Sequence, residues 1–171
     1  MSTTPNRSTP NGPAAEDSTM HVQIILDRSG SMKPIALATV DAINGFLSKQ
    51  RKQPRHLRIS LVDFDSREPF RIVTDAIRIA EIMDLAPSDY DPRGGTPLLD
   101  AIGLGIDRCS ARVAADPTED QLVVVITDGA ENASTDFTNA QIAELVTAKQ
   151  EEGWTILFLG ANKTASQLER D

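Results

Sequence analysis

Buried strands are the clearest feature of the hydrophobic pattern along the chain. Three runs of consecutive apolar residues are typical of strands covered on both faces, and a fourth segment alternates between apolar and polar residues. The four predicted strands are residues 21–26, 56–64, 121–127 and 154–159. A tight turn at Ser66-Arg67 leads into a short further strand at 68–73, which must run antiparallel to 56–64 because the connection is so short.

Helical periodicity fills most of the intervals between these strands. Pro34 and Pro97 are well placed in the first turns of two helices. A capping box of Thr138 and Gln141 begins a third helix, which Gly153 ends. The three apolar stripes are Ala36-Val40-Ile43-Phe46-Leu47, Leu98-Ile102-Ile106-Cys109-Val113 and Ile142-Leu145-Val146.

The order of these elements predicts the fold class. Strands that alternate with helices form a mostly parallel sheet with helices on both faces, so we expect a doubly wound α/β domain with one antiparallel edge strand. Residues 74–95 are dense in Asp, Pro and Gly around a short apolar stretch at 77–85, and are expected to form a long surface connection that contains one or two helical turns. A last helix is expected to begin in 163–171.

The N-terminal residues differ in composition from the rest of the chain. Residues 1–19 are rich in Ser, Thr, Pro and Asn, which predicts a disordered tail ahead of one domain over 20–171. The tail has no apolar centre, so it does not resemble a secretory signal. Two interpretations stand side by side: a genuine flexible tail, or translation that starts at Met20.

Composition and charge exclude several classes of protein. A length of 171 residues suits one domain. The 17 Lys and Arg against 25 Asp and Glu give a formal net charge of −8, short of the basic face of a nucleic-acid binder. The single cysteine, Cys109, can form no internal disulfide and belongs to no Cys/His zinc cluster, so a reducing, cytoplasmic setting is expected. No apolar run approaches the roughly 20 residues of a membrane span.

Three polar clusters interrupt the hydrophobic pattern at the ends of strands or the beginnings of helices. They are DRSGSM at 27–32, GGTPLLD at 94–100 and TDG at 127–129. Ligands of doubly wound sheets bind at the carboxyl ends of the strands, and all three clusters are expected at that edge. Their oxygen-bearing side chains are Asp27, Ser29, Ser31, Thr96 and Asp128. Hard cations such as Mg²⁺ or Mn²⁺ prefer oxygen ligands, so the clusters predict a divalent metal site.

Each cluster also has an ordinary structural explanation, since Asp and Ser cap helices and Asp-Gly forms turns. Their occurrence together, in this order, favours the metal site. Glu131 and Asn132 are expected to line its rim. Asp63 and Asp65 either support the metal ligands or form a turn, and Arg93 is expected in an ordinary ion pair.

The three clusters together resemble the metal-ion-dependent adhesion site of von Willebrand factor A domains. The match consists of Asp27-x-Ser29-x-Ser31, Thr96 and Thr127-Asp128-Gly129. The stretches PRGGTPLLDA, TDGAENAS and GWTILFLGAN are also similar to small stand-alone bacterial and phage members of the family. The resemblance implies that Ser29, Ser31 and Thr96 are hydroxyl ligands of the metal and that Asp27 and Asp128 are carboxylate ligands.

The resemblance spans about residues 20–160 and carries further expectations. The resemblance implies one of three roles for this chain: an adhesion module, a subunit of a chelatase-type complex, or a partner of an AAA+ ATPase. Family domains usually continue with another strand and helix beyond Leu159, so the domain is expected to be short at its C-terminus. The strand 154–159 would then lie at a sheet edge and favour self-association.

Charge and ligand chemistry favour a binding module over two alternatives. Two carboxylates balance one divalent ion while the three hydroxyls are neutral, so a partner Asp or Glu is the natural next ligand. A metal-dependent phosphoryl-transfer hydrolase would place a second acid where Ser29 stands, and no nucleophile–base pair lies nearby. A purely structural metal would need a sixth protein ligand, and none is apparent. We therefore expect a protein-binding module without catalytic activity.

Overall fold

Five strands, three α-helices and two short 3-10 helices make up the part of the chain that the structure describes. The computed structural model describes residues 19–53 and 56–160. The strands are β1 (Met20–Asp27), β2 (Leu57–Phe64), β3 (Arg71–Arg78), β4 (Asp120–Thr127) and β5 (Thr155–Gly160). The helices are η1 (Gly30–Ile35), α1 (Ala36–Gln50), η2 (Pro87–Asp89), α2 (Leu98–Ala115) and α3 (Asn139–Glu151). Residues 1–18 of the predicted tail at 1–19, and the predicted helix in 163–171, lie outside the described residues.

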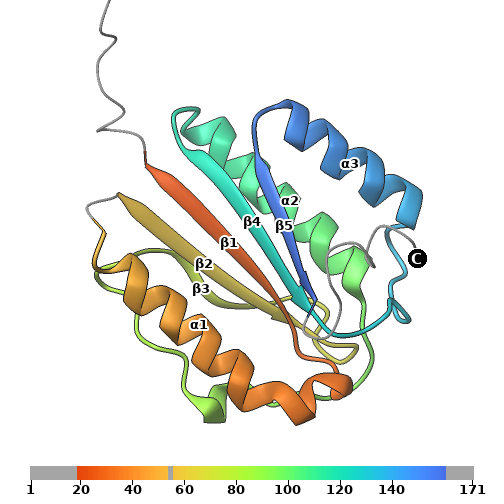
Figure 1. Ribbon diagram of the computed structural model, residues 1–171. Coiled ribbons are helices and arrows are strands. Elements are labelled where there is room, and N and C mark those ends of the chain that lie inside the picture. The colour runs from red at the N-terminus through yellow and green to blue at the C-terminus, as the bar shows by residue number, and fades with distance from the viewer. Residues whose placement is uncertain (1–18, 54–55, 161–171) are drawn as a thin grey trace, which may run out of the picture.

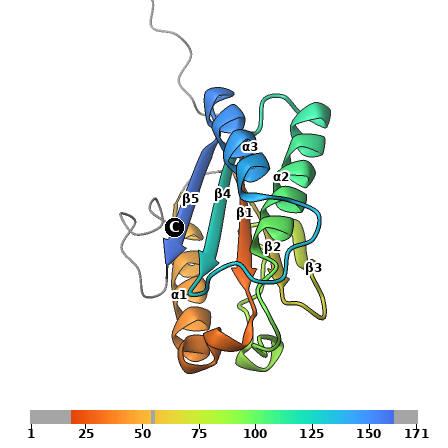
Figure 2. The same ribbon diagram turned by 90° about the vertical axis from the view of Figure 1, so that its right-hand side faces the viewer.

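The strands form one sheet in the order β3-β2-β1-β4-β5. Only β2 and β3 pair antiparallel, and the other three pairs are parallel. Helix α1 lies on one face of this sheet (Figure 1), whereas α2 and α3 lie on the other, as the turned view makes clear (Figure 2). The predicted fold class, a doubly wound α/β domain with one antiparallel edge strand, is therefore confirmed.

The core has two layers because the central strand β1 is buried on both faces. Val22, Ile24 and Leu26 pack with the apolar side of α1, while Ile25 packs in the second layer with α2. A strand of this kind must be apolar on both sides, which explains the continuous run that predicted it. The predicted capping box is also present, since Thr138 and Gln141 bond to each other's backbone at the start of α3.

The prediction for 68–73 was wrong in its bounds, because the regular strand begins only at Arg71. The tight turn at Ser66-Arg67 is present: the Asp65 N–H donates to the Glu68 carbonyl at 3.0 Å, and the Asp65 carboxylate accepts hydrogen bonds from the backbone N–H groups of Arg67 and Glu68. The strand then continues to Arg78, into the stretch for which helical turns were predicted.

The connection contains the short helical turns predicted for it. The Ile82 N–H donates to the Arg78 carbonyl at 3.1 Å, which closes one turn, and η2 forms another at Pro87–Asp89. Ile79, Ile82 and Leu85 are buried in the core layer beneath α1, so burial of these side chains rather than helical periodicity explains the apolar stretch.

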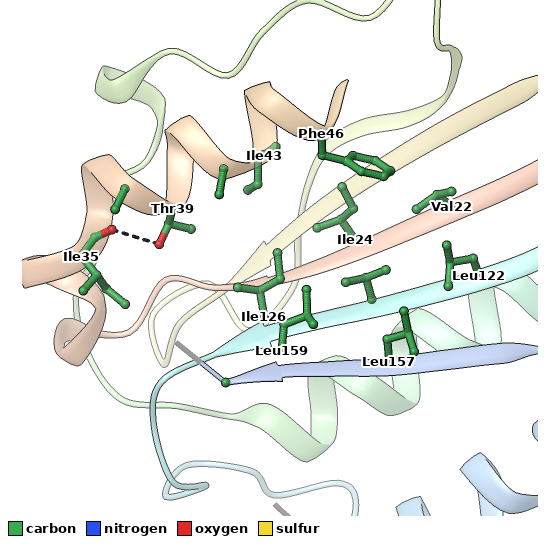
Figure 3. Close-up of a pocket in the computed structure, with 14 residues that line it drawn as sticks. Val22, Ile24, Ile35, Thr39, Ile43, Phe46, Leu122, Ile126, Leu157 and Leu159 are labelled. Carbon is green, nitrogen blue, oxygen red and sulfur yellow. Dashed lines mark hydrogen bonds between the residues drawn. The ribbon is translucent and has the colours of Figure 1, made fainter. Parts of the chain in front are cut away.

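The sheet face beside α1 has an open apolar groove over β4 and β5. Its volume is about 520 Å³, and side chains from α1, β1, β4 and β5 point into it, among them Phe46, Ile126 and Leu157 (Figure 3). Leu157 and Leu159 are 45% and 50% exposed. Within the described residues β5 pairs only with β4, so β5 lies at an edge of this sheet, as expected. None of the described helices is long and apolar enough to cross a membrane.

Candidate metal site

The predicted ligand clusters meet at one edge of the sheet because their strands are neighbours. β1 and β4 pair in parallel, β1 ends at Asp27 and β4 ends at Thr127, so the residues that follow them leave the sheet side by side. The cluster at 94–100 is joined to the cluster at 27–32 by a backbone hydrogen bond of 3.0 Å from the Gly30 N–H to the Gly94 carbonyl.

Four of the predicted ligands form one hydrogen-bonded chain. The Ser29 hydroxyl lies 3.0 Å from the Ser31 hydroxyl, which donates to Asp128 Oδ1 at 2.7 Å. Asp27 Oδ1 accepts from the Ser29 backbone N–H at 2.7 Å, and Asp27 Oδ2 accepts from the Thr127 hydroxyl at 2.6 Å. The structure therefore brings Asp27, Ser29, Ser31 and Asp128 together, with Thr127 as a support that the sequence did not reveal.

The fifth predicted ligand, Thr96, faces the same space beside Gly129. A Cβ atom placed on Gly129 would lie 3.3 Å from Ser31 Oγ, 3.4 Å from Thr96 Oγ1 and 3.8 Å from Asp27 Oδ2. Three oxygen atoms, two from the end of β1 and the loop after it and one from the loop before α2, thus surround the small volume that the missing side chain leaves. The residues fit a hard divalent cation, because all the donors are oxygen atoms and two of the five ligands are carboxylates.

The candidate site depends on hydroxyl groups as much as on acids. Within residues 19–53 and 56–160 no three His, Cys, Asp or Glu side chains cluster in a way that could hold a metal ion. Asp27 and Thr96 are buried, Asp128 is half-buried and Ser31 is exposed, so the site opens to solvent on the side of Ser31 and Asp128.

Burial raises the pKa of the Asp27 carboxyl above its usual value, and the nearby Asp128 charge adds to this effect. Hydrogen bonds from Thr127 and Ser29 act in the opposite direction without cancelling it. A cation between the two carboxylates would favour their charged forms, because opposite charges at short range stabilise each other.

Asp63, Asp65 and Arg93, whose roles the sequence left open, belong to an ion-pair network next to the site. Arg28 Nη2 lies 2.8 Å from Asp65 Oδ2 and 2.7 Å from Glu68 Oε2. Arg93 contacts the same two carboxylates, at 3.1 Å and 2.8 Å. Asp65 therefore forms the turn and also binds these arginines, and Asp63 pairs with Arg71. Hydrogen bonds and the arginine charges hold the pKa of Asp65 below its usual value in spite of its burial.

Glu131 and Asn132, which were expected to line the rim, also tie two loops together. The Asn132 side-chain oxygen accepts from the Thr96 backbone N–H at 2.8 Å. The Glu131 carboxylate accepts from the N–H of Leu99 in the first turn of α2 and from the N–H groups of Ala133 and Ser134. Both side chains bond to backbone groups near the site, although Asn132 is exposed and Glu131 is half-buried.

Tyr90 is a further support that sequence reasoning missed. It is 4% exposed, and its hydroxyl donates to the Asp27 carbonyl oxygen. Burial raises its pKa far above the usual value, so the phenol keeps the proton that it donates. The available signal was the chain's single tyrosine within a connection otherwise dense in Asp, Pro and Gly.

The fold and the arrangement of its loops define a class: a doubly wound α/β domain with a cluster of oxygen ligands at the carboxyl edge of its sheet. Residues 21–170 match the sequence model of the von Willebrand factor type A domain. Because this match covers most of the chain, the protein belongs to the von Willebrand factor type A family. Comparison with curated protein sequences gave no match.

Solved structures share the fold at low sequence identity. The pilus adhesin SpaC from Lactobacillus rhamnosus GG, in an open conformation, superimposes with a TM-score of 0.64 at 15% identity, over 84% of this chain and 24% of the SpaC chain. Three N-terminal domains of the type V pili tip protein Mfa5 from Porphyromonas gingivalis give a TM-score of 0.49 at 18% identity, over 72% of this chain and 22% of that one. The chain thus spans about a quarter of the length of these proteins, and the SpaC likeness concerns the fold alone.

Proposed function

We propose that this domain binds a partner protein through a divalent cation. Asp27, Ser29, Ser31, Thr96 and Asp128 would hold Mg²⁺ or Mn²⁺, and the ion would bind an Asp or Glu side chain of the partner. The observation that carries the proposal is the oxygen-lined space beside Gly129, which residues from three loops surround. Domains of this family commonly serve as protein-interaction modules, which supports the same conclusion.

The charges of the ligands explain why a partner carboxylate would be needed. Asp27 and Asp128 together balance the two positive charges of the ion, whereas Ser29, Ser31 and Thr96 add none. A bound cation supplies an electrophilic centre for an anionic oxygen atom. The exposed side of the site, at Ser31 and Asp128, is where such a ligand can approach.

The arrangement gives less support to catalysis. A phosphoryl-transfer enzyme needs an acid or base near the reacting group, and Ser29 stands where the second acid would be expected. His21, at the start of β1, bonds to Gln121 and Ser60 at the opposite end of the strand. The partner is therefore proposed as a protein with an accessible acidic side chain, such as an AAA+ ATPase or a subunit of a chelatase-type complex.

Affinity capture with and without a chelator tests the proposal. Binding of the captured partner should disappear in chelator and should also fail in Thr96→Ala, which removes a neutral hydroxyl and changes no charge. Thr118→Ala is the matched control, because Thr118 is a threonine in the loop at the other end of the sheet, where it bonds to Asp116. Partner binding that persists in chelator, or that tolerates Thr96→Ala, would show that the metal does not hold the partner.

A further inference from the structure

Both backbone polar groups of Thr96 are bonded to a single residue of another loop. The Thr96 N–H donates to the Asn132 side-chain oxygen at 2.8 Å, and the Asn132 N–H donates to the Thr96 carbonyl at 3.2 Å. Thr96 is 2% exposed, so water cannot readily replace these partners. Asn132 lies four residues after Asp128, and the pair of hydrogen bonds therefore joins two of the proposed ligand loops.

The neighbouring residue is anchored from the opposite side. Gly95 exchanges two hydrogen bonds with Ser66 of the β2–β3 turn, at 2.8 Å and 3.1 Å. Gly95 also allows Asn132 its close approach, because a Cβ at this position would lie 2.8 Å from the Asn132 side-chain oxygen. Thr96 is consequently held between two loops, and Asn132 is its contact on the side of Asp128.

We propose that Asn132 is a positioning residue that makes the site select Mg²⁺ over the larger Ca²⁺, an inference that rests on the proposed metal-binding function. Mg²⁺ requires near-ideal octahedral geometry with ligands at about 2.0–2.1 Å, whereas Ca²⁺ accepts flexible geometry at about 2.3–2.6 Å. The Thr96 backbone is held through both its N–H and its carbonyl, so the position of its hydroxyl is restricted. A ligand in a restricted position favours the ion that requires fixed geometry, which is Mg²⁺. If the Asn132 side chain is removed, the Thr96 backbone gains freedom, and Mg²⁺ loses more than Ca²⁺ does.

Calorimetric titration of the full chain with MgCl₂ and with CaCl₂ tests this selection. Asn132→Ala should lower Mg²⁺ affinity by roughly 10-fold or more, the range for groups that orient metal ligands, and should lower Ca²⁺ affinity by less. The Mg²⁺ to Ca²⁺ affinity ratio therefore falls. Ser134→Ala is the matched control, since it removes a hydroxyl that also accepts a backbone hydrogen bond in this loop, from Asp100 at 3.2 Å, but contacts no proposed ligand. This control should keep the wild-type ratio.

Two more variants separate positioning from general damage to the fold. Asn132→Asp keeps an acceptor for the Thr96 N–H; its added charge favours both ions, so the ratio should stay near that of the wild type. Gly95→Ala displaces the Asn132 side chain without removing it, and should lower the ratio as Asn132→Ala does. This variant keeps the test informative if Asn132→Ala does not fold, as judged by circular dichroism.

The outcomes also distinguish this inference from the proposed function. Wild-type protein that binds neither ion would refute the metal site itself. Wild-type protein that binds Mg²⁺, together with an unchanged ratio in both Asn132→Ala and Gly95→Ala, would refute the role of Asn132 alone. An equal loss of both ions in Asn132→Ala would also overturn the inference, because it would indicate a structural role without selection.

Discussion

Gly129→Ala is the most direct test of where the cation would lie. The added methyl group would occupy the volume between Ser31 Oγ, Thr96 Oγ1 and Asp27 Oδ2, at 3.3, 3.4 and 3.8 Å. These are contact distances for carbon and oxygen, so the methyl group fills the space, whereas Mg²⁺ needs the same oxygen atoms at about 2.0–2.1 Å from its own centre. The methyl group and the ion cannot be present together. We expect Mg²⁺ affinity to fall at least about 10-fold, which corresponds to about 1.4 kcal/mol.

The same substitution should change the stability of the metal-free fold much less. Gly129 does not adopt a positive φ, so alanine fits its backbone. Loss of glycine's freedom in the unfolded chain favours the variant by about 0.4–1 kcal/mol, and the two contacts tighter than 3.5 Å oppose this gain. The net change in unfolding free energy should stay within about 1 kcal/mol, which lies within the range of ordinary substitutions.

Calorimetric titration with MgCl₂ and urea unfolding in chelator measure the two effects separately. Gly45→Ala is the control, because a Cβ at this exposed position in α1 has no neighbour within 4 Å. It should raise stability by about 0.5–1 kcal/mol, as expected for replacement of glycine in a helix, and leave Mg²⁺ affinity unchanged. Wild-type affinity in Gly129→Ala would refute the reasoning, since the ion would then have to lie elsewhere.

Three further predictions concern charge, the sheet edge and pH. Asp27→Ala and Asp128→Ala should each weaken Mg²⁺ binding by at least about 10-fold in calorimetry, because the ion loses a compensating charge; unchanged affinity in both would contradict the assignment. Self-association through β5 should appear by light scattering at high concentration and decrease in Leu157→Lys, since a lysine at an edge opposes pairing; a wild-type chain that stays monomeric would count against this. Burial lowers the pKa of His21, so the folded protein favours the neutral ring and loses stability as the pH falls below about 6.5, where the unfolded histidine takes up a proton. The unfolding free energy should therefore fall less between pH 7 and pH 5.5 in His21→Gln than in the wild type or in the control His56→Gln, and equal slopes would exclude His21 as the cause.

The strands and helices that follow from a local hydrophobic pattern could be predicted from the sequence. The bounds of β3 could not be predicted in this way. β1 is buried on both faces, and β4 is buried on one face and half-buried on the other, so their apolar runs predict these strands directly. β3 lies at an edge, partly exposed, and contains Ala76 at a φ of 50°, which interrupts its alternation. The Ala76 N–H bonds to the Ser60 hydroxyl of β2 at 2.9 Å, so a tertiary contact supports this conformation. The sequence of residues 68–78 alone gives no indication of that contact, so the bounds of β3 could not be predicted from it.

The candidate site also contains residues whose positions could be predicted from the sequence and residues whose positions could not. Asp27 and Asp128 are predictable as neighbours because Asp27 ends β1 and Asp128 directly follows β4, and the parallel pairing of these strands places their ends together. Thr96 could be named as a candidate from its polar cluster before a helix, but its distance from the other ligands could not be predicted, since its position depends on the path of a long connection. Its actual supports, Asn132 and the Ser66 contact to Gly95, act on backbone groups across loops. A side chain that bonds to a backbone group does not require a particular residue type in its partner. Such a contact therefore cannot be inferred from the residue types in a single sequence.

Some of the proposed ligands lie at the ends of strands, and others lie on loops that hydrogen bonds hold in place. Substitution of a ligand at a strand end and substitution of a residue that holds a loop should therefore have different effects on metal binding. Removal of Asp27 or Asp128 alters the charge that any cation meets, and affects all divalent ions alike. Removal of the Asn132 contact alters only how firmly Thr96 is held, and affects ions according to their demand for fixed geometry. If the proposed site is correct, both kinds of substitution lower Mg²⁺ affinity, but only loss of the contacts between loops should change the ratio of Mg²⁺ to Ca²⁺ affinity.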